Sequence, residues 1–390
     1  MATARRHRKV GRWGVVLLTT IALIACDPIL HPTHTQVASS TSGLTAILLS
    51  GDGNYVLATS SGTDGIVPSA GVWRIRRSDH TSAPVASNYA FGISRDGSRI
   101  QTFDGIWVNG VMRPYPSPRN HLATAPDLDA VAYDDNTGVV KLYDPVHDTT
   151  SPIDTGPPPA NANAAPIVFE VSDAGRIVHV LWPTPYSCAI DGFVDVPNGV
   201  TYNLPRNCET QLTRHMSADG SVYLEGTAPQ PGETPTIVQL VTTSGAAGRS
   251  YTVPAGYQWD ASRAPLSANG AVAWITISHQ DAPYEVTDRQ MVAVTTTGSR
   301  SLPVVPGAQI TYEIGGFDVT RGGRFALVTI DAGYDDTHAA TQVVDWVTGT
   351  VETLPKVEFG QVPVGAGISD DARVVVVRAS QGGWYEFTAP

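Results

Sequence analysis

The feature that most constrains this chain is a short unit, Ser-x-Asp-Gly, that recurs between apolar, β-branched segments. In Ile93-Ser94-Arg95-Asp96-Gly97 the Ser and Asp side chains can bond their own backbone, and the Gly supplies a positive φ at low cost. A tight turn between two such segments joins antiparallel strands. The unit therefore predicts a protein built from repeated hairpins.

Copies of the unit recur to the C-terminus with a mean spacing of about 46 residues, close to the length of a four-stranded propeller blade. The positions equivalent to Ser94 are 50, 94, 125, 172, 217, 267, 320 and 369. The third copy, Thr124-Ala125-Pro126-Asp127-Leu128, is degenerate. We expect an all-β fold: a single β-propeller of four-stranded antiparallel blades. The number of blades is eight, or seven if the third copy does not form a blade of its own.

The last repeat ends one strand short of a complete blade, with expected strands only at Val374–Ala379 and Trp384–Thr388 after its turn. A ring left open there would expose an unpaired edge, which is an aggregation liability. We expect the segment before Leu44 to donate the missing strand, and Thr35–Ala38 can pair in this way.

The N-terminus reads as an export signal. A basic stretch, Arg5 to Arg12, precedes a largely apolar run from Trp13 to Ala25 that is too short for an ordinary membrane span. The run ends in Leu23-Ile24-Ala25-Cys26, which resembles the bacterial lipobox. The resemblance implies cleavage before Cys26, acylation of that residue and a stable membrane anchor outside the cytoplasm.

We accordingly divide the chain into a signal peptide (1–26), a tether with a candidate closing strand (27–42) and the propeller (43–390). The signal peptide carries five Lys/Arg and no Asp/Glu, so its removal changes the net charge from −11 to −16. This charge argues against nucleic acid as a partner. The expected partners are the membrane, through the lipid, and a protein or envelope component, with the protein itself a monomer.

Cys188 and Cys208 remain after Cys26 is assigned to lipid. The segment between them reads as a hairpin that turns at Pro197-Asn198-Gly199, midway between the two cysteines, which would place them opposite each other. Disulfides persist in exported proteins, and a redox-active pair more typically has C-x-x-C spacing. We expect a structural disulfide.

The alternation of apolar strand, Ser-x-Asp-Gly and apolar strand resembles the TolB-like and WD-repeat-like propellers of bacterial periplasmic proteins. The resemblance covers nearly all of residues 43–390, although the Ser-Pro-Asp-Gly form is largely missing and Ala125-Pro126-Asp127 is its nearest match. It implies the architecture, and it does not name a partner.

If the strands of each blade are lettered A to D outward from the axis, the A–B and C–D turns share one face of the ring. The B–C loops lie on the other face, where we place any binding site. The long ones are Ser60–Ala70, Pro183–Asp191, Thr227–Pro235, Ser278–Arg289 and Asp331–Ala340. The last carries Asp331, Asp335, Asp336 and His338, a candidate binding loop whose carboxylates could hold calcium, although it does not match an EF-hand.

The leading functional hypothesis is a noncatalytic, lipid-anchored scaffold that binds a partner through the B–C loops. We identify no catalytic residue and require no cofactor. In the Ser-x-Asp-Gly unit the Gly follows the Asp directly, unlike in a sialidase Asp box, and no room is left for a hydrolase domain with G-x-S-x-G. The alternative is a metal-dependent hydrolase or lactonase whose site gathers residues of distant blades at the channel mouth.

Overall fold

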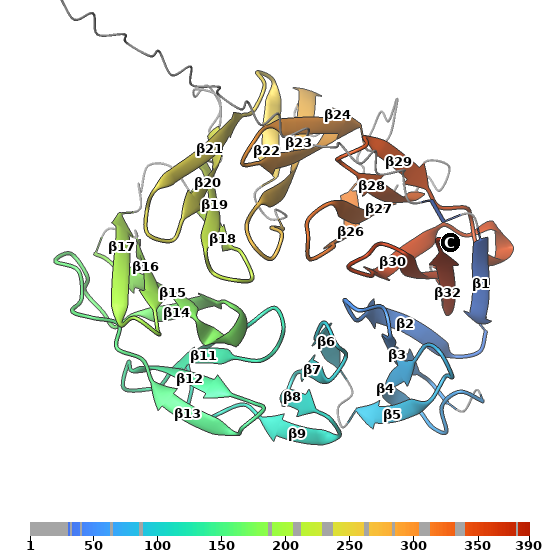
Figure 1. Cartoon of the computed structure of the whole chain (residues 1–390), viewed down its shortest axis with the longest axis horizontal. Coiled ribbons are helices and arrows are strands. Elements are labelled where there is room, and N and C mark those ends of the chain that lie inside the picture. The colour runs from blue at the N-terminus through green and yellow to red at the C-terminus, as the bar shows by residue number, and fades with distance from the viewer. Residues whose placement is uncertain are drawn as a thin grey trace, which may run out of the picture.

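The computed structural model describes residues 30–31, 33–39, 41–62, 65–85, 89–185, 189–205, 212–227, 237–260, 265–282, 285–303, 313–331, 340–379 and 381–390. Within these ranges the chain forms 32 strands and two short 3-10 turns, η1 (Asp173–Gly175) and η2 (Glu358–Gly360). The strands form blades arranged in a ring around a central axis (Figure 1). No helix in the described ranges is long and apolar enough to cross a membrane.

Each blade is an antiparallel sheet of four strands, A to D from the axis outward. The A strands are β2 (Leu44–Leu49), β6 (Ala90–Ile93), β10 (His121–Thr124), β14 (Ile167–Val171), β18 (Leu212–Met216), β22 (Tyr257–Asp260), β26 (Glu313–Val319) and β30 (Pro363–Ile368). The B strands are β3 (Tyr55–Ser60), β7 (Arg99–Thr102), β11 (Val131–Asp134), β15 (Ile177–Pro183), β19 (Val222–Thr227), β23 (Val272–Ala282), β27 (Phe325–Asp331) and β31 (Val374–Ala379).

The C strands are β4 (Gly71–Arg76), β8 (Gly105–Val108), β12 (Val140–Asp144), β16 (Ala189–Asp195), β20 (Ile237–Thr242), β24 (Glu285–Thr295), β28 (Ala340–Asp345) and β32 (Gly382–Thr388). The D strands of the first seven blades are β5 (Ser82–Val85), β9 (Val111–Pro114), β13 (Thr149–Pro152), β17 (Val200–Pro205), β21 (Ala247–Thr252), β25 (Ser299–Pro303) and β29 (Thr350–Thr353). The weak third repeat has its own sheet, β10–β13, so the ring has eight blades.

The N-terminal strand closes the ring, as predicted. β1 (Thr33–Ala38) pairs antiparallel with β32, from Thr33 opposite Thr388 to Ala38 opposite Trp384, and is the D strand of the eighth blade. Figure 1 shows this blue strand beside the red C-terminal strands. A single parallel bridge, Thr45 to Gly383, also ties β2 to β32.

The core lies between the blades. Eight apolar clusters of buried residues each join the facing sheets of two neighbouring blades, one cluster for each junction of the ring. At the closing junction, Trp384 and Val376 of the eighth blade pack with Leu44 and Val56 of the first, and all four are fully buried. Because each blade buries both faces, its stability depends on both neighbours.

One predicted loop has a different structure. We expected Ser278–Arg289 to be a B–C loop, but β23 and β24 continue as a paired hairpin as far as Ala282 and Glu285. Valine, isoleucine and threonine on both sides favour extension of the strands over a loop. The sixth blade therefore has a long β-hairpin where the prediction has irregular chain.

The ring has two faces. The mouth face carries the A–B and C–D turns, and the loop face carries the B–C and D–A connections. The segment before β1 enters on the mouth face, where His31 is buried between blades seven and eight. Its Nδ1 lies 2.7 Å from Glu352 Oε2 and its Nε2 lies 2.7 Å from the carbonyl oxygen of Ala372. The His31 main-chain N–H also donates to Glu352 Oε1 at 2.7 Å, so this residue fixes the start of the closing strand.

Candidate functional site

The repeated turns surround the channel mouth, and the recurring residues of the unit hold each turn together. Ser94 Oγ donates to Asp96 Oδ1 at 2.8 Å and accepts the N–H of Arg99 at 2.9 Å, while the Gly97 N–H donates to the Ser94 carbonyl. Gly97 has a φ of +68°, and a Cβ there would collide with the Tyr55 ring of the first blade. The same Ser–Asp contact occurs at Ser50, Ser217 and Ser369. These residues are structural.

The variable residue of the unit, directly after the Ser, differs from blade to blade and faces the mouth. In ring order the eight residues are Gly51, Arg95, Pro126, Asp173, Ala218, Ala268, Arg321 and Asp370. All of them except Asp173 line a cavity of about 300 Å³ at the mouth, and Asp173 is bonded to Arg321. The position that carries no repeat signal thus supplies Arg95, Arg321 and Asp370 to the wall of the mouth.

At least one hydrogen bond joins each pair of neighbouring turns, and one from each of the eight junctions makes an unbroken circle. Five junctions use main-chain carbonyls as acceptors. They are Asp52 N to Arg95 O, Asp173 N to Ala218 O, Asp219 N to Ala268 O, Ala268 N to Arg321 O and Asp370 N to Gly51 O, at 2.7–2.9 Å.

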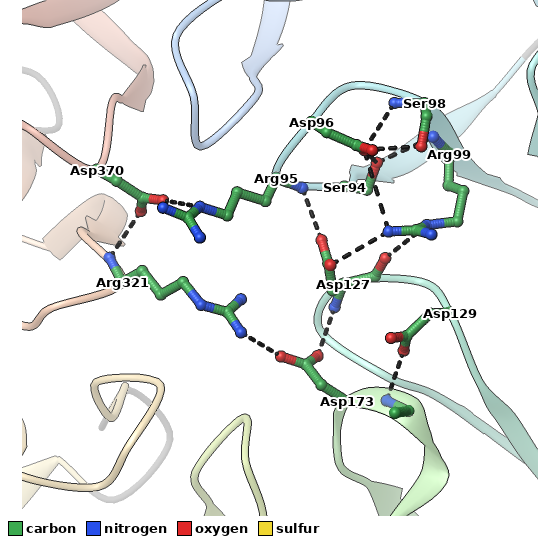
Figure 2. Close-up of polar contacts among 11 residues, drawn as sticks. Ser94, Arg95, Asp96, Ser98, Arg99, Asp127, Asp129, Asp173, Arg321 and Asp370 are labelled. Carbon is green, nitrogen blue, oxygen red and sulfur yellow. Dashed lines mark hydrogen bonds and ion pairs between the residues drawn. The ribbon is translucent and has the colours of Figure 1, made fainter.

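Carboxylates are the acceptors at the other three junctions, which Figure 2 shows. The N–H of Arg95 donates to Asp127 Oδ1 at 2.8 Å, and the N–H of Asp127 donates to Asp173 Oδ1 at 2.8 Å. The N–H of Arg321 donates to Asp370 Oδ1 at 2.9 Å. Hydrogen bonds to an ionised acceptor are the stronger kind.

Each of these three carboxylates also pairs with an arginine. Arg95 Nε lies 2.7 Å from Asp370 Oδ2, Arg321 Nη2 lies 2.8 Å from Asp173 Oδ2, and Arg99 Nη2 lies 3.2 Å from Asp127 Oδ2. The Arg321 pair joins the seventh blade to the fourth across the mouth (Figure 2).

The Arg95–Asp370 pair passes over the first blade, where a Cβ on Gly51 would lie 3.0 Å from both side chains. A residue with a side chain at position 51 would therefore push the two apart. The glycine of the first repeat leaves the space that the pair between blades two and eight requires.

Burial opposes ionisation in the pair that crosses the mouth. Desolvation raises the pKa of Asp173, and the hydrogen bonds from the Asp127 N–H and Arg321 only partly offset it. Desolvation lowers the pKa of Arg321, but the hydrogen bond and charge of Asp173 outweigh it, so that pKa is raised. The raised pKa of Asp173 disfavours its charged form, whereas the raised pKa of Arg321 favours its charged form. The 2.8 Å contact argues that both groups are charged at neutral pH.

Below the mouth the cavity continues between blades seven, eight, one and two, with a volume of about 370 Å³. Its walls include Ile47, Leu49, Ile93 and Leu327. Asp318, two residues before the turn of the seventh blade, borders both cavities and is exposed to the channel. Its carboxylate accepts the N–H groups of Val319 at 2.9 Å and Ile368 at 3.1 Å.

The surrounding wall desolvates Asp318 and raises its pKa to about 6, and the charge of Asp370 adds to this shift. Its contact with water in the channel works against the increase. In the described part of the chain, Asp127, Asp173 and Asp370 at the mouth have arginine partners, whereas the carboxylate of Asp318 accepts only main-chain N–H groups.

A second polar group is buried between blades four and five. His179 Nε2 lies 2.8 Å from Asp191 Oδ1, and its ring stacks on Phe193 with centroids 4.5 Å apart. Glu170 lies 3.6 Å from His179 Nδ1 and 3.7 Å from His215 Nδ1. Desolvation of His179 is outweighed by these carboxylates, so its pKa is raised. Strands from two blades bring these residues together.

The sequence-predicted site residues fall mostly beyond the described ranges. Cys26, Cys188, Cys208, Asp335, Asp336 and His338 all lie outside them. Asp331 is the last residue of β27, at the loop face. Within the described part of the chain, no three His, Cys, Asp or Glu side chains are grouped so as to hold a metal ion.

The loop face carries an apolar patch that the sequence analysis did not identify. Phe103, Tyr89 and Phe91 are 72%, 69% and 59% exposed, the highest values among the large hydrophobic residues described. Tyr89 and Phe91 flank Ala90, which pairs with Thr102, and Phe103 follows Thr102. These three residues, here called the aromatic patch, therefore lie at one end of the second blade.

No family model matches the sequence. No curated protein matches it either. Among solved structures, an oligogalacturonate lyase in complex with manganese is similar over 92% of this chain and 93% of its own, with a TM-score of 0.50 and 12% identity. At this identity the likeness concerns the propeller fold alone.

Two further propellers are similar at lower TM-scores. The Dos1 propeller has a TM-score of 0.47 and 13% identity, covering 91% of this chain and 94% of its own. The Cps50 (Swd1) propeller domain of Myceliophteria thermophila has a TM-score of 0.44 and 10% identity, covering 92% and 100%.

Proposed function

We propose that this protein is a lipid-anchored, extracytoplasmic propeller that binds a protein or envelope component without catalysing a reaction. The observation that carries the proposal is the aromatic patch on the loop face, since exposed aromatic clusters are typical of interaction sites. The mouth face, on the opposite side of the ring, also supports the proposal. There the described arginines and carboxylates contact one another and brace the ring.

The position of His31 fits an anchored propeller whose loop face is free. Cys26 and His31 are five positions apart, so an acylated Cys26 would lie within about 17 Å of the fixed start of the closing strand. That start is on the mouth face. Acylation would therefore hold the mouth face near the bilayer and leave the aromatic patch on the side that is turned away.

Replacement of Cys26 by Ser tests the anchor. We expect the Cys26→Ser protein to leave the membrane fraction, and mass analysis of the wild-type N-terminal peptide to show acyl chains on Cys26. A wild-type chain with an unmodified Cys26 would contradict the anchor, although the binding role would still stand.

Replacement of Phe103 by Asp tests the binding role. Affinity capture of the wild-type protein after crosslinking in its own membrane should yield a specific partner, and Phe103→Asp should reduce its recovery at least tenfold. Val347→Asp is the matched control, because Val347 is an apolar residue 47% exposed in a turn of the mouth face. Equal losses from both variants, or from neither, would contradict binding through the aromatic patch.

A further inference from the structure

The deeper cavity differs from the mouth in its charge. It is lined by apolar and glycine residues with one hydroxyl, Thr329, and one ionisable side chain, Asp318, among the described residues. At the mouth a carboxylate is matched by a guanidinium within 3.2 Å in three cases. The carboxylate one layer below lies beside an apolar wall, and no cation pairs with it among the described residues.

We propose that this cavity binds an organic cation: an ammonium group on a short aliphatic stem, with the ammonium at Asp318 and the stem against Ile47, Leu49, Ile93 and Leu327. The volume of about 370 Å³ lies within the range of small-ligand sites. An aliphatic stem suits the apolar wall, and its charged end suits the carboxylate of Asp318.

Two further observations support a cation. The wall beside Asp318 and the negative charge of Asp370 both raise its pKa, to about 6, so a bound cation would favour the ionised form. The guanidinium groups of Arg95 and Arg321 border the mouth cavity and are engaged by Asp370 and Asp173. The net charge of −16 that remains after signal removal would attract cations to the protein.

Two kinds of ligand carry such an ammonium group: a free amine and the lysine side chain of a partner protein. The site is separate from the aromatic patch, so either proposal can fail while the other stands. The test uses the full-length protein in detergent and measures binding of n-butylammonium by calorimetry. n-Butanol, which has the same stem without the charge, is the matched ligand.

We expect n-butylammonium to bind and n-butanol to bind at least tenfold more weakly. Asp318→Asn should reduce the affinity for n-butylammonium at least tenfold, since the amide keeps an acceptor for the Ile368 N–H but loses the charge. Asp104→Asn is the control for net charge, because Asp104 is an exposed residue of the second blade away from the cavity. Unfolding curves of both variants would show that they remain folded.

Wild-type affinity should also fall as the pH drops through about 6, where Asp318 becomes protonated, while that of Asp318→Asn stays flat. Absence of n-butylammonium binding, equal affinity of wild type and Asp318→Asn, or equal affinity for n-butanol would each overturn the proposal. A lysine peptide that binds more tightly than n-butylammonium and loses its affinity on acetylation would assign the cation to a protein. Binding of n-butylammonium without binding of the peptide would assign it to a free amine.

Discussion

The turns of the fifth and third repeats join their neighbours differently. In the fifth repeat, Asp219 accepts a hydrogen bond from Ser217 Oγ inside its own turn, and the junction to the next blade uses a main-chain carbonyl. In the third repeat Ala125 stands where the Ser would be, and Asp127 bonds instead to the N–H of Arg95 and to Arg99. Loss of the hydroxyl frees the carboxylate to reach the neighbouring blade.

The fourth and seventh repeats show the same relation. Their turns, Ser172-Asp173-Ala174-Gly175 and Thr320-Arg321-Gly322-Gly323, lack the Asp of the unit. They supply instead the Arg321–Asp173 pair that crosses the mouth. Degenerate copies of the repeat can thus carry specific contacts of the ring, and the complete second copy adds one more through Arg95 and Asp370.

The largest expected effect is that of Asp173→Ala. It removes the acceptor of the Asp127 N–H and the partner of Arg321, and the Asp173 side chain is only 13% exposed. We expect a loss of about 2–3 kcal/mol in the free energy of unfolding, measured in urea. Asp219→Ala, which breaks contacts within one turn, should cost about 1 kcal/mol. Equal losses would remove the distinction between the two kinds of turn.

Arg321→Ala should have a smaller effect, because its side chain is 35% exposed. We expect a loss of about 1 kcal/mol, against less than about 0.5 kcal/mol for Arg95→Ala, whose side chain is 56% exposed. A double-mutant cycle of Arg321→Ala with Asp173→Asn isolates the pair across the mouth. A coupling energy near zero would mean that this pair does not brace the ring.

A further expected effect depends on pH and concerns the carboxylate of Asp318, which has no arginine partner among the described residues. Its folded-state pKa, raised to about 6, means that the folded protein binds the proton more tightly than the unfolded chain. Its contribution to stability is therefore complete below the unfolded-state pKa near 4 and is lost as the pH rises through about 6. The difference in unfolding free energy between wild type and Asp318→Asn should show this decline. A difference that is constant from pH 4 to 7 would contradict it.

The repeat predicted most of the fold because its signal is local: a turn flanked by apolar segments fixes two strands at once. The eight blades and the closing strand before Leu44 followed from counting such units and from the cost of an open edge. The long hairpin of the sixth blade was not predicted, because its polar tip resembles a loop in sequence.

The contacts at the channel mouth could not be predicted from the sequence for a different reason. Arg321 and Asp173 are 148 positions apart, and only closure of the ring brings them together. A signal for them was nevertheless present. The variable position of the unit carries two Arg and two Asp at sites that the repeat leaves unconstrained. Five copies lack a unit residue, and four of them (the third, fourth, seventh and eighth) belong to blades that make these contacts.

The central claim is that this propeller, anchored through Cys26, binds its partner with the loop face. Its most direct test places a photo-crosslinking residue at position 103 on the loop face or at position 347 on the mouth face, in cells with Cys26 intact. The account predicts a specific crosslinked product from position 103 and none from position 347. A product from position 347 alone, or the same product from both positions, would contradict it.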